Sequence, residues 1–148
     1  MRLVIQRVSR AEVRVGGEVA GRIGPGLLLL VAIEKGDADG VLDWCSDKVL
    51  NMRIFEDSAG KMNRSILETR GEILVVSQFT LAADLTRGRR PGFEKAAAPS
   101  EAEPRYRALI ARLAGSGLKI ETGRFREFMD VELVNDGPVT FVLDSGGR

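Results

Sequence analysis

The feature that most constrains the fold is an unbroken apolar run at residues 73–76, Ile-Leu-Val-Val. A short run of this kind, rich in β-branched residues, is typical of a strand that is buried on both faces. The sequence then turns polar at Ser77, Gln78 and Thr80, with Phe79 between them. The run therefore predicts a central strand of a covered sheet that ends in hydroxyl and amide groups.

The polar end of this strand is a candidate site, because its last backbone N–H groups leave the ladder and can face a ligand. A simpler alternative is that the hydroxyls of Ser77 and Thr80 only satisfy backbone groups at the strand end. This stretch alone favours the simpler alternative. A second stretch changes the balance.

The second stretch is Asn-Asp-Gly-Pro-Val-Thr at 135–140, which lies between strand-like runs at 130–134 and 139–143. Gly-Pro is a turn signal, since Gly137 can adopt φ values closed to other residues and Pro138 has a fixed φ and no N–H. From its spacing alone, the stretch predicts an ordinary turn between two strands. The sequence leaves open whether the Gly137–Pro138 bond is cis or trans.

The absence of histidine excludes several kinds of chemistry. No Ser-His-Asp triad, Cys-His pair or His-bearing zinc site is possible. Cys45 is the single cysteine, which excludes thiolate clusters and an internal disulfide, and its helical setting favours a core residue. No calcium-loop pattern is present, so we expect no metal and no cofactor. A hydrolase of this sequence would need a carboxylate, water or the substrate itself for proton transfer.

The order of predicted elements gives the fold class. Alternation with glycine turns predicts strands over residues 1–33, and helical spacing predicts a helix over 37–52, capped by Asp37 or Asp39. A Ser-Glu-Ala-Glu capping box at 100–103 precedes a second helix that runs to about Ala114, with an apolar face formed by Tyr106, Leu109, Ile110 and Leu113. Further strands are predicted at 53–55, 73–78, 118–122, 130–135 and 139–144, with 61–70 as a loop that can hold short elements.

We therefore expect one α/β layered domain over residues 1–148, with mixed or antiparallel sheets in a barrel- or sandwich-like arrangement and two main helices on one side. The longest apolar run, residues 27–33, is too short for a membrane helix, and the N-terminus shows no apolar signal region. These features predict a cytoplasmic protein without a membrane partner.

Basic residues concentrate in one segment although the net charge is only +1. Arg87, Arg89 and Arg90 stand among glycines and a proline, close to Phe93, directly after the candidate strand end. Arginines on such a loop suit phosphate contact and stacking in RNA binding. The alternative is a solvated charge run, but the position beside the candidate site favours the RNA interpretation.

The two stretches together resemble the D-aminoacyl-tRNA deacylase family, the chirality-proofreading hydrolases. Its two signatures, Ser-Gln-Phe-Thr-Leu and Asn-x-Gly-Pro-Val-Thr, stand intact at 77–81 and 135–140. The N-terminal stretch at 1–8, Asn-Met-Arg-Ile-Phe at 51–55 and Gly-Arg-Arg-Pro at 88–91 are also similar, so the resemblance covers essentially the whole chain. One departure stands at 125–129, Phe-Arg-Glu-Phe-Met, where relatives usually show small residues between the first Phe and the Met.

The resemblance implies a homodimeric hydrolase that cleaves the ester joining a D-amino acid to the 3′ end of tRNA. The signature residues would line the pocket, where their backbone N–H groups would hold the carbonyl and its developing oxyanion. The Gly-Pro loop of one subunit would enter the pocket of the other. The implied site residues are Ser77, Gln78, Phe79 and Thr80 in the pocket, Gly137 and Pro138 facing the amino acid, Met129 near the terminal adenine, and Arg7 bracing the Gly-Pro loop.

Arg7 has an alternative interpretation as an exposed edge charge, and the whole chain has two alternative functions. One is an RNA-binding module without chemistry. The other is a structural or interaction protein whose Gly-Pro loop only seals a dimer. Deacylation of D- against L-aminoacyl-tRNA, measured beside binding of uncharged tRNA, separates these functions. The sequence does not name the preferred amino acid or tRNA.

Overall fold

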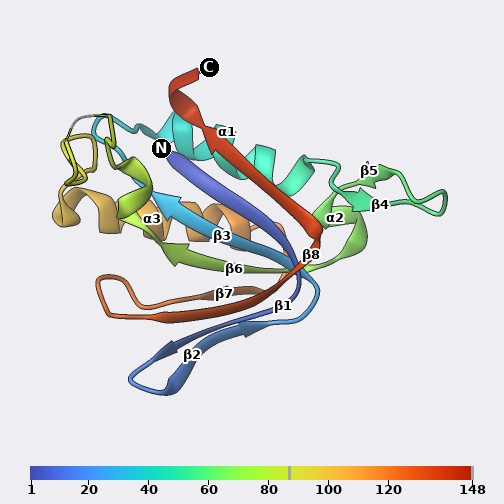
Figure 1. Ribbon diagram of the computed structural model, residues 1–148. Helices are drawn as coiled ribbons and strands as arrows, with labels where there is room; N and C mark the ends of the chain where they lie inside the picture. The colour runs from blue at the N-terminus through green and yellow to red at the C-terminus, as the bar shows by residue number, and fades with distance from the viewer. Residues whose placement is uncertain (87, 148) are drawn as a thin grey trace.

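The computed structural model describes residues 1–86 and 88–147 (Figure 1). Arg87, one of the arginines expected to bind RNA, lies outside the described residues. The strands are β1 (Arg2–Val15), β2 (Glu18–Ile23), β3 (Gly26–Ala32), β4 (Phe55–Glu56), β5 (Met62–Arg64), β6 (Glu72–Ser77), β7 (Ile120–Thr122) and β8 (Asp130–Asp144). The helices are α1 (Asp39–Asn51), α2 (Ile66–Thr69) and α3 (Pro99–Ala114), with 3-10 turns η1 (Phe79–Ala82) and η2 (Ser145–Gly147).

The main sheet is mixed and curls into a nearly closed barrel. Its order is β2-β1-β3-β6-β7, and β8 pairs with β1 as well. β1 is antiparallel to its three partners, whereas β6 is parallel to both β3 and β7. The edges β2 and β7 approach so closely that a Cβ on Gly21 would lie 2.6 Å from the carbonyl oxygen of Thr122. Only glycine fits at this contact, which brings the two ends of the sheet together.

The central strands are buried on both faces, as the apolar run at 73–76 predicted. Ile73 and Val75 pack with α1 and α3 in one core, and Leu74 and Val76 pack inside the barrel in a second core. β3 alternates in the same way. Figure 1 shows both long helices on the side of the sheet away from β2. The predicted fold class, an α/β domain with two main helices on one side of a barrel-like sheet, is confirmed.

The predicted turn at Gly137–Pro138 is wrong. β8 is one strand that runs through both residues, because the long β1 pairs with it on either side of them. Gln6 faces Thr140 and Val8 faces Asn135, so Arg7 lies opposite a bulge of four residues, 136–139. The Gly-Pro stretch is therefore a bulge within a paired strand, and the chain does not change direction there.

The predicted helix caps are also wrong. α1 has Ala38 at its N-cap without a side-chain hydrogen bond, because the Asp37 carboxylate instead accepts from the Glu34 N–H at 2.7 Å. α3 begins with Pro99 after Ala98, again without a side-chain cap, since proline suits the first turn of a helix. A capping box instead lies at Ser65 and Glu68, at the start of α2, in the stretch 61–70 for which a loop with short elements was predicted.

Among residues 1–86 and 88–147, no helix is both long enough and apolar enough to cross a membrane.

Candidate active site

A cavity of about 620 Å³ opens where β6 ends. β6 and η1 supply Ser77, Gln78 and Phe79 to its wall, and α3 supplies Ala102. The opposite wall is the segment 125–129, which leads from β7 into β8. The cavity thus brings Ser77, Gln78 and Phe79 of the first signature together with Met129. Thr80 stands at the edge of this group without lining the cavity.

The backbone donors of the signature are not equivalent. The Gln78 N–H donates to the Val31 carbonyl at 2.8 Å, which continues the β3–β6 ladder. Phe79 and Thr80 open a 3-10 turn, so their N–H groups have no earlier carbonyl within the turn. Within residues 1–86 and 88–147 these two N–H groups have no hydrogen-bond acceptor. Phe79 and Thr80 are therefore the residues whose backbone is available to a ligand.

The side chains of the signature are tied to their neighbours. The Gln78 amide donates from Nε2 to Thr80 Oγ1 at 2.5 Å. An amide cannot take a proton from a hydroxyl, so this contact does not activate Thr80 as a nucleophile. Phe79 is 55% exposed and its ring centroid lies 5.1 Å from that of Phe93. Phe93 and Phe79 form an aromatic edge to the cavity.

The segment that departs from the family pattern lies on the cavity rim. Arg126 has a φ of 65°, in the left-handed region that favours glycine, and its side chain is exposed. Phe128 is 88% exposed. Met129 is held close to the chain, since its sulfur would lie 2.6 Å from a Cβ built on Gly123. The departure therefore adds an arginine and a free aromatic ring to the mouth of the cavity.

Titratable groups are scarce at this site. Of the described residues that line the cavity, Arg126 and Glu127 are ionisable, and both are exposed. No cluster of three or more His, Cys, Asp or Glu side chains suited to a metal ion occurs in the described residues. The chemical resources of the cavity are backbone N–H groups, apolar walls and aromatic edges.

The segment that carries Arg89 and Arg90, here named the basic loop, follows η1 directly in the chain. Asp84 and Gly92 close its base through paired backbone hydrogen bonds of 2.7 and 2.9 Å. The Asp84 carboxylate accepts from the Thr86 hydroxyl at 2.6 Å and from the Thr86 N–H at 2.9 Å, and these two bonds lower the pKa of Asp84. Arg89 and Arg90 are exposed at the far end of the loop. The loop is the yellow segment beside η1 in Figure 1, at the same end of the molecule as the tip of β6.

Gly137 and Pro138 lie outside this cavity in the described part of the chain. Their peptide bond is cis, and both residues are exposed. Asn135 spans the bulge, since its amide Nδ2 donates to the carbonyls of Arg7 at 2.8 Å and Val139 at 3.0 Å. The Thr140 hydroxyl donates to the Asn135 amide oxygen at 3.3 Å. The Asn and Thr of the second signature thus replace the ladder bonds that the bulge removes.

Arg7 points inward beneath this bulge and is buried. Its Nη1 donates to the Ile54 carbonyl at 2.8 Å, and its Nε lies 3.1 Å from a carboxylate oxygen of Asp136. The same Nε donates to the Asp136 carbonyl at 3.3 Å. The exposed edge charge is therefore the wrong alternative for Arg7. Its part in substrate binding stays a prediction.

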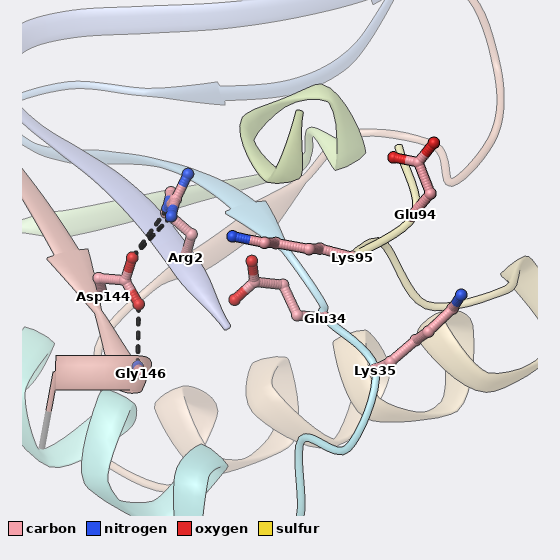
Figure 2. A pocket seen from close by; sticks show the side chains of 7 residues that line it. All are labelled: Arg2, Glu34, Lys35, Glu94, Lys95, Asp144 and Gly146. Atoms are coloured by element: carbon pink, nitrogen blue, oxygen red, sulfur yellow. Dashed lines mark hydrogen bonds and ion pairs between the residues drawn. The ribbon is translucent and has the colours of Figure 1, made fainter. Parts of the chain in front are cut away.

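A second cavity, of about 720 Å³, lies on the other side of η1 (Figure 2). The Arg2 guanidinium donates to Asp144 at 2.8 Å and to the Leu81 carbonyl of η1 at 2.9 Å. Lys95 points toward Arg2 and Glu34 in Figure 2. Six charged side chains line this cavity in balanced number: Arg2, Lys35 and Lys95 against Glu34, Glu94 and Asp144. This balance sets it apart from the candidate active site, and none of residues 77–81 lines it.

For some residues around the site, the sequence pattern indicates burial but not the contacts that their side chains make. Tyr106 was identified as part of an apolar helix face, yet its hydroxyl donates to the Val75 carbonyl of β6 at 2.8 Å. Phe125 packs on Tyr106 with ring centroids 5.7 Å apart and also lines the cavity. Helical spacing predicts that the Tyr106 ring is buried, but it does not predict the hydrogen-bond partner of the hydroxyl, which lies on a strand distant in sequence.

A mixed α/β barrel with a cavity at a strand end and free backbone donors beside it has the layout of a small enzyme domain. A family profile described as D-Tyr-tRNA(Tyr) deacylase matches residues 4–144. The chain belongs to this family, and the resemblance drawn from its two signatures is confirmed.

Individual relatives agree with the family. A protein of Symbiobacterium thermophilum named D-aminoacyl-tRNA deacylase is 57% identical over 145 residues, which cover 98% of this chain and 96% of the relative. A solved structure titled c-Myc DNA Unwinding Element Binding Protein is 40% identical with a TM-score of 0.92, and the match covers 98% of this chain and 99% of that one. A second, titled as a probable eukaryotic D-amino acid tRNA deacylase, is 17% identical with a TM-score of 0.85 over 96% and 97% of the chains, and supports the fold alone.

Proposed function

We propose that the protein hydrolyses the ester bond of D-aminoacyl-tRNA and releases tRNA and the free D-amino acid. The observation that carries this proposal is the pair of free N–H groups at Phe79 and Thr80, beside a cavity in a chain of this family. Ester hydrolysis creates negative charge on the carbonyl oxygen, and fixed backbone donors stabilise that charge without reorganising.

The structure refines the expected role of the signature. All four residues at 77–80 were expected to offer backbone donors, but the Gln78 N–H is committed to Val31. We assign the oxyanion contact to the N–H groups of Phe79 and Thr80. Ser77 and Gln78 then shape the cavity wall, and Met129 packs near the terminal adenine.

Water is the attacking nucleophile in this proposal, and Thr80 is not. Among residues 1–86 and 88–147 its hydroxyl has the Gln78 amide as its hydrogen-bond partner and no base, and the chain contains no histidine. Water attacks the ester carbonyl carbon, the bond from this carbon to the 3′ oxygen breaks, and that oxygen leaves with a proton. The 2′-OH of the terminal adenosine stands beside the ester, and we propose that it positions or activates the water.

A substrate with 2′-deoxyadenosine at its end tests this step. It should bind as the normal substrate does and should not turn over. Full activity on the deoxy substrate, or an acyl group trapped on Thr80, would show that the chain itself supplies the nucleophile or its activation.

Selection of the D-isomer is assigned to Gly137 and Pro138. Enantiomers carry the same groups, so a pocket separates them by where those groups are forced to point. Side chains can change rotamer, whereas a backbone held by Arg7 and Asn135 cannot shift easily. Because these residues lie outside the cavity of their own chain, we propose a homodimer in which the Gly-Pro bulge of one subunit enters the cavity of its partner.

The tRNA is held by the basic loop in this proposal. Arg89 and Arg90 are exposed beside the cavity, and Arg87 belongs to the same segment. Guanidinium groups bind phosphates through paired donors, so these arginines are assigned to the acceptor backbone.

The alternatives are separated by one pair of assays on the purified protein. Release of the amino acid from D-aminoacyl-tRNA but not from L-aminoacyl-tRNA, together with binding of uncharged tRNA, supports the proposed hydrolase. Binding without release from either isomer indicates an RNA-binding module. Neither binding nor release indicates a structural protein.

A further inference from the structure

We propose that Tyr106 is a positioning residue for the reaction: its hydroxyl bonds to β6 where β7 stops and fixes the end of β6 from which the oxyanion donors project. This inference rests on the proposed function for its effect on turnover. The geometry on which it stands is independent of that function.

The sheet is incomplete at the end of β6. On one side, β3 pairs with β6 as far as Ser77, and the ladder continues through the Gln78 N–H to Val31. On the other side, pairing with β7 stops at Val75 and Thr122, and the Gly123 N–H supplies the last bond to the Val75 carbonyl at 3.1 Å. The final residues of β6 are therefore supported by a strand on one side only.

Tyr106 reinforces β6 at the point where β7 stops. The Tyr106 hydroxyl donates to the Val75 carbonyl at 2.8 Å, and the Gly123 N–H donates to the same carbonyl at 3.1 Å. In a strand, alternate residues direct their backbone groups to the same side, so Ser77 faces the same side as Val75. The hydroxyl thus adds a second bond at the last carbonyl of β6 that β7 reaches.

The Tyr106 side chain is held in this position by its packing. Tyr106 is 4% exposed, and its ring packs against Phe125, which lines the cavity. Ala102, one turn earlier on α3, also lines the cavity, while Tyr106 stands behind it. Burial raises the pKa of the Tyr106 phenol, against the opposing effects of Arg107 and the Ser77 backbone. The phenol therefore remains a hydrogen-bond donor and takes no part in proton transfer.

The consequence for the reaction follows from the short distance along the chain. Ser77 is separated from Phe79 by a single residue, and Phe79 begins η1. If the end of β6 loses its bond from Tyr106 to Val75, the turn that presents the Phe79 and Thr80 N–H groups can tilt. A misplacement of about 1 Å at a catalytic group can lower the rate by about a hundredfold.

The test is Tyr106→Phe, which keeps the ring and removes the hydroxyl. We expect kcat on D-aminoacyl-tRNA to fall by between tenfold and a hundredfold while KM changes by less than about twofold, because the contact acts on the transition state. Amide hydrogen exchange at residues 77–80 should become faster. Substitution by 4-aminophenylalanine, whose para-amine also donates, should restore both properties.

Ser46→Ala is the matched control. The Ser46 hydroxyl is also buried and donates to a backbone carbonyl, that of Asp43 at 2.9 Å, but it lies on α1 outside the cavity. This variant should lose a comparable amount of thermal stability and keep its kcat. Equal kcat for the two variants, with unchanged exchange at 77–80, would overturn the positioning role.

Two further comparisons decide the proposal if Tyr106→Phe does not fold or if the unmodified protein is inactive. If Tyr106→Phe does not fold, 4-methylphenylalanine and 4-aminophenylalanine provide a pair of similar size that differs in hydrogen bonding, and equal exchange at 77–80 in that pair overturns the proposal. If the unmodified protein does not cleave D-aminoacyl-tRNA, the proposed function fails. The amide-exchange comparison then still decides whether Tyr106 holds the end of β6.

Discussion

Substitution of Gly137 by alanine tests the backbone filter at its most constrained residue. Gly137 has a φ of 126°, a conformation that L side chains rarely adopt. A Cβ placed there would lie 2.7 Å from Val139 Cγ2 and 3.1 Å from Arg7 Nη2. Arg7 cannot withdraw easily, because it is buried and donates to the Ile54 carbonyl at 2.8 Å. The new methyl group therefore pushes on the bulge itself.

The magnitude follows from these two effects. A residue forced into a sparsely populated backbone region costs about 1–3 kcal/mol. For a chain of this size, each kcal/mol lowers Tm by about 2–4 °C, so backbone strain alone predicts a decrease of about 2–12 °C. The contacts with Val139 and Arg7 add to this. In the proposed dimer a displaced bulge also crowds the substrate, and we expect D-aminoacyl-tRNA cleavage to fall by about a hundredfold.

The assay compares Gly137→Ala with Gly17→Ala. Gly17 has a φ of 85° in the β1–β2 turn, and a Cβ there would meet nothing within 4 Å. Both variants carry backbone strain, but only Gly137→Ala adds contacts in the bulge. Thermal unfolding and single-turnover cleavage are measured for both. If Gly137→Ala keeps full activity and loses no more stability than Gly17→Ala, the bulge neither clashes nor contacts the substrate, and the reasoning is refuted.

Three other predictions concern the loop, the signature and the acid range. Removal of Arg89 or Arg90 should weaken binding of different tRNAs similarly and reduce the salt slope by about 1, whereas an effect on one tRNA at constant slope indicates base readout. Ser77→Ala and Thr80→Ala should slow turnover less than Gly137→Ala and still refuse L-aminoacyl-tRNA; ready cleavage of the L form would place the filter in these side chains. Hydrogen bonds from the Gly146 N–H and from Arg2 lower the pKa of the Asp144 carboxyl in the folded protein. The ionised carboxylate therefore stabilises the fold fully above the ordinary carboxyl pKa of about 4, and this contribution is lost as the pH falls through the lower pKa of the folded state. Asp144→Asn should therefore unfold more easily at pH 7 and match the parent near pH 2; an equal deficit at both pH values would contradict this linkage.

The local sequence pattern was sufficient to predict elements whose structure depends on burial alone. The apolar run at 73–76 gave the central strand because both of its faces need cover, and both cores provide it. The spacing of Tyr106, Leu109 and Leu113 gave the buried face of α3 for the same reason. Ser77, Gln78 and Phe79 of the first signature line one cavity with Met129, whereas Thr80 does not line it.

Local pattern failed where a distant partner determines the outcome. Gly-Pro indicates a turn, but β1 is long enough to pair with β8 on both sides of it. Asp37 suits a helix cap, yet its carboxylate is used by Glu34 N–H and by the Met1 amine at 2.6 Å. The hydroxyl of Tyr106 meets β6 across the fold. Apart from Glu34, these partners lie far away in the sequence, so no local window of residues contains them.

The central claim is hydrolysis of the D-isomer with refusal of the L-isomer at one site. The most direct measurement mixes D- and L-aminoacyl-tRNA in one tube, with the same amino acid and tRNA but different radiolabels on the two isomers. Protein, salt and tRNA are then identical for both, and the ratio of released labels reports the selection alone. The account predicts rapid release of the D label while release of the L label stays at the rate of the reaction without protein. Equal release of both labels, or release of neither, would contradict it.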